Sequence, residues 1–145
     1  MKRDERRAVP PSGRRDRGTF SMFTVLFTPS VLLFAGLLLD GGMAIHARER
    51  ALDIAEQSAR KGADQIDVEH LRDTGEIILD GTACGEAVAF AGNFPGGYAA
   101  VCNETGPDEV TVNVTTQVEP VFLGLFIQTN FQIDVNASAH PEDGA

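Results

Sequence analysis

Residues 19–39 form an unbroken run of twenty-one positions without a charged side chain. The hydrocarbon core of a bilayer, about 30 Å thick, requires about 20 helical residues at about 1.5 Å each. Because a lone segment in lipid must pair its backbone polar groups internally, a helix is the form expected for it. The run therefore predicts a transmembrane helix at 19–40 that tethers the chain to a membrane.

The two sides of this run carry opposite charge. Residues 1–18 hold seven basic and three acidic side chains, a net charge of +4, whereas the remainder holds five basic and eighteen acidic ones, a net charge of −13. Basic residues that flank a span stay on the cytoplasmic side. We therefore expect 1–18 to be a disordered cytoplasmic tail and the body to be extracytoplasmic. A body of this charge would be repelled by phosphates, which argues against nucleic acid as a partner.

A cleavable secretory signal is the alternative interpretation of the apolar run. Such signals have a shorter apolar region of about 7–15 residues, followed by a small-x-small cleavage site. The run here is longer, and the residues after it offer no clean Ala-x-Ala sequence. A retained single-pass anchor in the cell membrane is the favoured interpretation.

Beyond the run, small residues recur at helical spacing. The alanines of this stripe lie three or four positions apart: Ala44, Ala47, Ala51, Ala55, Ala59 and Ala63. We expect one helix over roughly 19–66, with 41–69 continuing the span outside the membrane. Small side chains bury little area but allow close approach of a neighbouring backbone. The stripe is expected to be a helix-packing face, either on the protein's own sheet or also on copies or partners, and both readings remain open.

The rest of the chain, 70–145, is expected to be a small β-rich domain. Strands are expected at 76–80, 98–102, 110–115 and 131–139, with a short helix at 83–91. Alternation of apolar and polar residues in the last two strands is typical of an antiparallel sheet with one wet face. The predicted fold class is α+β: a long N-terminal transmembrane helix, continuing as a soluble amphipathic helix, packed on a small antiparallel β-sheet.

Two features near the expected membrane boundary stay open. Asp40 would serve as an anchor at the helix end, where its carboxylate reaches water, or make a polar contact with another membrane helix. The segment at 120–127 is too apolar for an ordinary solvated loop. It is expected to pack on the helix, to lie near the bilayer surface or to touch a partner.

Cys84 and Cys102 are the two cysteines of the chain. A single pair in an oxidising compartment is most simply a disulfide. A metal site would need more ligands than two cysteines supply. We therefore predict a disulfide bond and no metal.

No catalytic constellation is recognisable in the sequence. The chain has no nucleophile elbow, no phosphate-binding loop and no Cys-x-x-Cys motif. His46, His70 and His140 are scattered and are expected to be surface residues. We expect no enzyme activity, no cofactor and no small-molecule substrate.

Several segments of the chain resemble the TadE/TadG-like proteins of the bacterial Flp (tight adherence) pilus system. They are the basic residues and glycine at 14–18, Asp-Gly-Gly at 40–42, the Ala-rich 47–63, and the C-terminal segments 110–115 and 120–126. The resemblance covers most of 14–140. It implies a membrane-anchored pseudopilin or assembly factor whose N-terminal helix contacts other pilus or secretion assembly proteins. A single-pass anchored binding module unrelated to pili, such as a sensor or adhesin, is the alternative.

The resemblance also bears on processing. TadE-type prepilins are cut after a glycine and carry a glutamate at the fifth residue of the mature chain. Gly18 and Thr19 match such a processing site, but Phe23 occupies the fifth position. The exit of the span is closer to the TadG-like N-terminal segment, which is anchored without a clear cleavage signature. We therefore expect most of the protein to stay full-length in the membrane.

Overall fold

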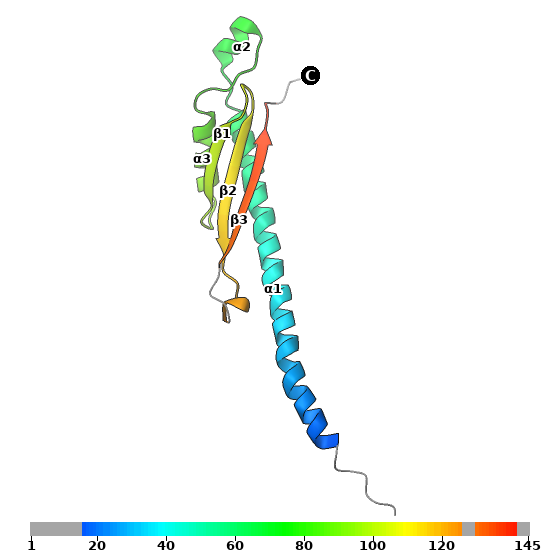
Figure 1. Ribbon diagram of the computed structural model, residues 1–145. Coiled ribbons are helices and arrows are strands. Elements are labelled where there is room, and N and C mark those ends of the chain that lie inside the picture. Colours follow the sequence, from blue (N-terminus) through cyan, green and yellow to red (C-terminus); the bar gives the residue numbers. More distant parts are fainter. Residues whose placement is uncertain (1–15, 126–129, 142–145) are drawn as a thin grey trace, which may run out of the picture.

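The computed structural model describes residues 16–125 and 130–141, and it has one long helix lying along a small sheet (Figure 1). The elements in chain order are α1 (Asp16–Ala63), α2 (Val68–Thr74), α3 (Ala83–Gly92), β1 (Ala99–Glu104), β2 (Val110–Val118), the 3-10 helix η1 (Leu123–Leu125) and β3 (Phe131–Ala139). The predicted α+β class is confirmed.

Helix α1 is continuous over 48 residues, as the sequence predicted, and would be about 72 Å long at the standard helical rise. It runs through Pro29 without ending. The hydroxyls of Thr24, Thr28 and Ser30 each donate a hydrogen bond to the backbone carbonyl four residues earlier, at 2.8–3.0 Å. These polar side chains are therefore satisfied within the helix itself, as a lipid environment would require.

The two halves of α1 have different surroundings (Figure 1). Apolar side chains between Phe20 and Leu39 are mostly exposed, whereas one face of the helix from Ala51 onward lines the hydrophobic core. Among the described residues, α1 is the one helix long and apolar enough to cross a membrane. Helix α1 thus has an N-terminal half with exposed apolar side chains and a C-terminal half that packs against the core.

The sheet has the order β1-β2-β3, and both strand pairs are antiparallel. Helices α1 and α3 cover one of its faces. Val110, Val112 and Val114 of the central strand β2 point into that face and are fully buried, while the residues between them are half-buried. The alternation predicted from the sequence is therefore the alternation observed.

The alanine stripe meets this core directly. Ala51, Ala55, Ala59 and Ala63 are at most 1% exposed, and they pack with α3 and the sheet. Ala44 and Ala47, nearer the span, are half-buried. Of the two readings left open by the sequence, the structure shows packing on the protein's own sheet. The four buried alanines have no surface left for a second molecule.

The disulfide joins the other helix to the sheet. Cys84 of α3 is bonded to Cys102 of β1, with their Cα atoms 5.3 Å apart. Strand β1 is an edge strand, so the bond holds the edge of the sheet against α3. No free cysteine remains in the chain.

The predicted strand at 76–80 is wrong. The segment forms a single bridge, Ile66 to Leu79, while the Leu79 amide donates to the Pro107 carbonyl at 2.8 Å and the Asp80 amide to the Gln65 carbonyl at 2.8 Å. Because its hydrogen bonds go to two different segments, no ladder can form.

Helix α2 was not predicted from the sequence. Its cap is Asp67, whose carboxylate accepts from the amides of Glu69 and His70 at 3.0 and 2.9 Å. Gly75 ends it in the left-handed region, at a φ of 78°. The interval 41–69, expected to be one helix, thus contains the end of α1 at Ala63, a short connection and the start of α2.

Candidate functional site

Asp40 is the most unusual residue along α1, because it is 1% exposed and yet ionisable. Its carboxylate accepts hydrogen bonds from three successive backbone amides of the β2–β3 connection. The Val121 amide donates to Oδ1 at 3.0 Å, the Phe122 amide lies 3.2 and 3.1 Å from Oδ1 and Oδ2, and the Leu123 amide donates to Oδ2 at 2.7 Å. The carboxylate therefore acts as a cap for η1, although it lies more than eighty residues away in the sequence.

This arrangement corrects both sequence interpretations of Asp40. The side chain does not reach out as a solvated anchor, and its hydrogen-bonding capacity is used within its own chain. A carboxylate removed from water is costly unless it is hydrogen-bonded, and amide hydrogen bonds to a charged acceptor are among the stronger ones. The interaction therefore clamps the β2–β3 connection onto α1.

One turn before Asp40, Gly36 allows that connection to come close. A Cβ placed on Gly36 would lie 2.7 Å from the Phe122 Cβ and 3.2 Å from its Cγ, so any larger residue would displace Phe122. Below this contact lies an apolar hollow of about 330 Å³ lined by Pro29, Leu32, Leu33, Gly36, Phe122, Leu123 and Leu125. The segment at 120–125 packs on the helix, which was one of the three sequence alternatives. Residues 126 and 127 lie outside the described residues.

Gly36 and Asp40 were missed as packing residues, although the sequence carries a signal for them. Continuing the alanine stripe toward the N-terminus in steps of four leads from Ala44 to Asp40 and then to Gly36. Both are buried, on the same side of α1 as the alanines that line the core. The face that packs on the sheet thus extends into the apolar half of the helix.

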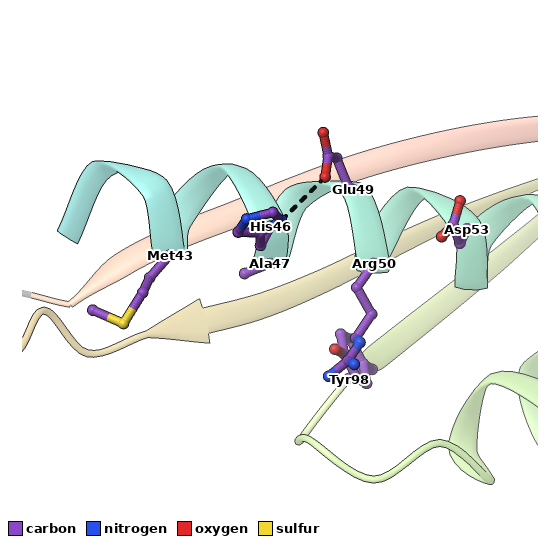
Figure 2. A pocket seen from close by; sticks show the side chains of 7 residues that line it. All are labelled: Met43, His46, Ala47, Glu49, Arg50, Asp53 and Tyr98. Atoms are coloured by element: carbon purple, nitrogen blue, oxygen red, sulfur yellow. Dashed lines mark ion pairs between the residues drawn. The ribbon is translucent and has the colours of Figure 1, made fainter. Parts of the chain in front are cut away.

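A second feature is an open groove of about 540 Å³ beside α1, where the sheet begins (Figure 2). It is lined by Met43, His46, Ala47, Glu49, Arg50, Asp53 and Tyr98. In Figure 2 the Arg50 side chain extends from α1 toward Tyr98. A mixed set of cationic, anionic and aromatic groups on an open surface suits contact with another polypeptide better than enclosure of a small molecule.

The histidines lie at three separate places. His46 forms an exposed pair with Glu49 at 3.4 Å, and His70 lies 4.0 Å from Glu76. His140 approaches Asp108 and Glu109 at 3.9 and 3.7 Å. Within residues 16–125 and 130–141, no three His, Cys, Asp or Glu side chains gather as they would around a metal ion.

The residues that the resemblance suggested as a processing site, Gly18 and Thr19, lie at the start of α1. Gly18 is exposed inside the first turns of the helix, with Thr19 and Phe23 following on the same apolar half. An added Cβ at Gly18 would meet nothing within 4 Å. This end of the helix is therefore accessible on the described part of the chain.

Comparison with known proteins shows a similarity to one family over part of the chain. Neither the curated proteins nor the solved structures give a match to the chain. Residues 18–65 match the Tad family, described as Flp pilus-assembly TadE/G-like. The matched interval begins at Gly18 and ends two residues after α1, so it coincides with the helix that carries Gly36, Asp40 and the alanine stripe. The resemblance seen in the sequence is confirmed over this interval, while the C-terminal segments at 110–126 lie outside it. The N-terminal helix of this protein is thus similar to the Flp pilus-assembly TadE/G-like segment of the Tad family.

Proposed function

We propose that the protein is a non-enzymatic, single-pass membrane component that acts in the assembly of a Flp-type pilus or a related secretion apparatus. The observation that carries the proposal is the coincidence of the Tad match, 18–65, with α1. The family segment is the same element that has the apolar, exposed half and the half that holds the folded domain. In this proposal, α1 both anchors the protein in the membrane and contacts the other assembly proteins.

The proposed orientation follows the charge of the chain. The net charge of +4 in residues 1–18 favours the cytoplasmic side, and the acidic remainder, with the disulfide, favours the extracytoplasmic side. Labelling with a membrane-impermeant maleimide tests it. Ser12→Cys in a Cys84→Ala/Cys102→Ala background should label only after permeabilisation, whereas the reduced native cysteines should label in intact spheroplasts. The reverse pattern would contradict the orientation.

Contact with other assembly proteins is placed on the surfaces of α1 that its own domain leaves bare. The exposed large apolar side chains from Phe20 to Phe34 have exposed fractions of 47–75%. We also place contact at the groove lined by Met43 and Tyr98, which lies beside α1 beyond the proposed span (Figure 2). Because the alanines from Ala51 onward are buried, they are not part of the proposed contact.

We further propose that the chain acts at full length. An apolar Phe23 cannot pair with the amine that cleavage after Gly18 would free on a neighbouring molecule, so docking into a filament by that route would be weak. N-terminal sequencing of the protein from native membranes should therefore give the uncut chain. A chain starting at Thr19, recovered from sheared filaments, would contradict this.

Deletion and complementation in the native cell test the assembly role. Deletion should abolish filaments or secretion through the apparatus, and both the wild-type chain and Gly18→Ala should restore them. Restoration by the wild type but not by Gly18→Ala, with normal amounts of both proteins, would instead favour processing. Unchanged filaments and secretion after deletion would refute the assembly role and favour the anchored binding module.

A further inference from the structure

The β2–β3 connection presents apolar side chains outward beside the bare half of α1. Val121, Phe122 and Leu125 are 60%, 43% and 79% exposed. Residues 120–125 contain no charged, amide or hydroxyl side chain. An outward-facing group of this kind would be unfavourable in water, and it continues the apolar surface of Leu32 and Leu33 across the hollow between them.

Most of the backbone amides of residues 120–125 have hydrogen-bond partners within the protein. The amides of Val121, Phe122 and Leu123 donate to Asp40, the Leu125 amide donates to the Phe122 carbonyl at 3.3 Å, and Pro120 has no amide hydrogen. Irregular backbone is tolerated at membrane depth only where its polar groups find protein partners. A buried carboxylate that takes three amides meets that requirement directly.

The position of the connection along α1 gives its depth. Leu123 and Leu125 share the apolar hollow with Pro29, Leu32 and Leu33, which precede Asp40 by seven to eleven residues. At the helical rise this corresponds to about 10–16 Å from Asp40 toward the centre of the span. Figure 1 shows the connection reaching below the sheet along α1.

We propose that residues 120–125 form a second membrane anchor, inserted into the outer leaflet beside α1, with Leu125 among lipid acyl chains and Asp40 replacing water for its amides. The proposal rests on the span of the proposed function. Its occupant is lipid, because the exposed group is continuous with the exposed apolar side chains Leu32 and Leu33 of α1, and because the amides of Val121, Phe122, Leu123 and Leu125 are already paired. The connection would fix the domain against the bilayer at a second point.

Tryptophan fluorescence tests the depth, since the native chain contains no tryptophan. Three full-length variants are made: Leu125→Trp, Phe34→Trp within the span, and Val101→Trp on β1. Each is reconstituted in phosphatidylcholine vesicles whose brominated acyl chains quench tryptophan fluorescence. Positions 34 and 101 are comparably exposed, 65% and 60%, so they serve as matched lipid and water references. Leu125→Trp should be quenched about threefold more than Val101→Trp and should approach Phe34→Trp.

The outcomes separate the two proposals. If Phe34→Trp is quenched and Leu125→Trp behaves as Val101→Trp, the second anchor is refuted and the span stands. If neither is quenched, the span itself is refuted. Quenching of Leu125→Trp that falls as the protein-to-lipid ratio rises, while Phe34→Trp stays constant, would put a second copy against Leu125 and refute lipid as the occupant.

The Asp40 carboxylate is tested in the same way. Asp40→Ala in the Leu125→Trp background should lower the quenching to that of Val101→Trp. Without the carboxylate, three backbone amides lose their hydrogen-bond acceptor and must leave the lipid to bind water. Glu56→Ala, an exposed acidic position on the same helix, is the control and should leave the quenching unchanged. Circular dichroism, together with an intact-mass measurement that shows the disulfide has formed, verifies that both variants fold. Unchanged quenching in a folded Asp40→Ala protein would overturn the role given to the carboxylate.

Discussion

Gly36 and Phe122 lie so close that a single methyl group at position 36 would come within 2.7 Å of the Phe122 Cβ. The contact joins the apolar half of α1 to the β2–β3 connection, one turn from the Asp40 hydrogen bonds. Close approach of this kind is available only to glycine. It explains why a residue of poor helix propensity stands in the middle of a long helix.

Replacing Gly36 with alanine should therefore release the connection. An overpacking cost of about 1–3 kcal/mol is expected, which corresponds to hydrogen exchange of the Val121–Leu123 amides that is about 5-fold to 140-fold faster. Exchange measured by mass spectrometry on the full chain in detergent would detect it. Gly41→Ala is the matched control, because an added Cβ there meets nothing within 4 Å. Equal protection in both variants would contradict the packing role of Gly36.

Larger residues on the alanine stripe should unfold the domain rather than loosen an assembly. Ala51→Leu and Ala55→Leu each add bulk at a position that is 0% exposed, and each should cost about 1–3 kcal/mol or more of unfolding free energy. Denaturant unfolding followed by circular dichroism would measure the loss. Ala89→Leu, at an exposed position of α3, should be nearly neutral. Normal stability with lost partner association would contradict the observed packing.

The Cys84–Cys102 bond should contribute measurably to stability. It closes a loop with a sequence separation of 18, and removing it in Cys84→Ala/Cys102→Ala should cost about 2–4 kcal/mol. Wild-type protein unfolded under reducing conditions should match the double variant. Intact-mass measurement after alkylation without reductant should show no modified cysteine in the native protein. Alkylation of both thiols under those conditions would show that the bond is absent from the native protein.

Removal of the Ser58 hydroxyl should stabilise the domain. Ser58 is 0% exposed, and its hydroxyl forms no hydrogen bond with any described residue. Ser58→Ala should gain about 1 kcal/mol, because it removes an unsatisfied polar group and improves helix propensity. The exposed Gln57→Ala should change the unfolding free energy little. A loss of stability in Ser58→Ala would mean that the hydroxyl has a partner in solution.

The sequence was a good guide wherever a periodic pattern determined the structure. The run at 19–39 and the alanine stripe predicted α1, and the alternation at Val110, Val112 and Val114 predicted β2. Prediction failed at 76–80, whose apolar residues have the composition of a strand but hydrogen-bond to two separate segments. Composition alone does not contain that information.

The hydrogen bonds of Asp40 and the contact of Gly36 could not be predicted from the sequence, because they too depend on residues far apart in the chain. The Asp40 carboxylate and its three amides are 81–83 residues apart, so no local pattern links them. Gly36 differs from Gly41 and Gly42 in the sequence by lying in step with the alanine stripe, but its contact with Phe122 is seen only in the structure. The histidines, by contrast, lie at exposed or half-exposed positions, in keeping with the surface role expected for them.

The uninterrupted course of α1 has a mechanical consequence. Helix α1 has no break between its apolar half and the core, so in the proposed membrane topology the domain would follow the tilt of the helix as a rigid body. From Asp40 to Ala63 the helix measures about 35 Å, and a change of about 10° in tilt would move its far end by about 6 Å. If α1 spans a membrane as proposed, a force on its apolar half would thus displace the end of the domain near α2 sideways.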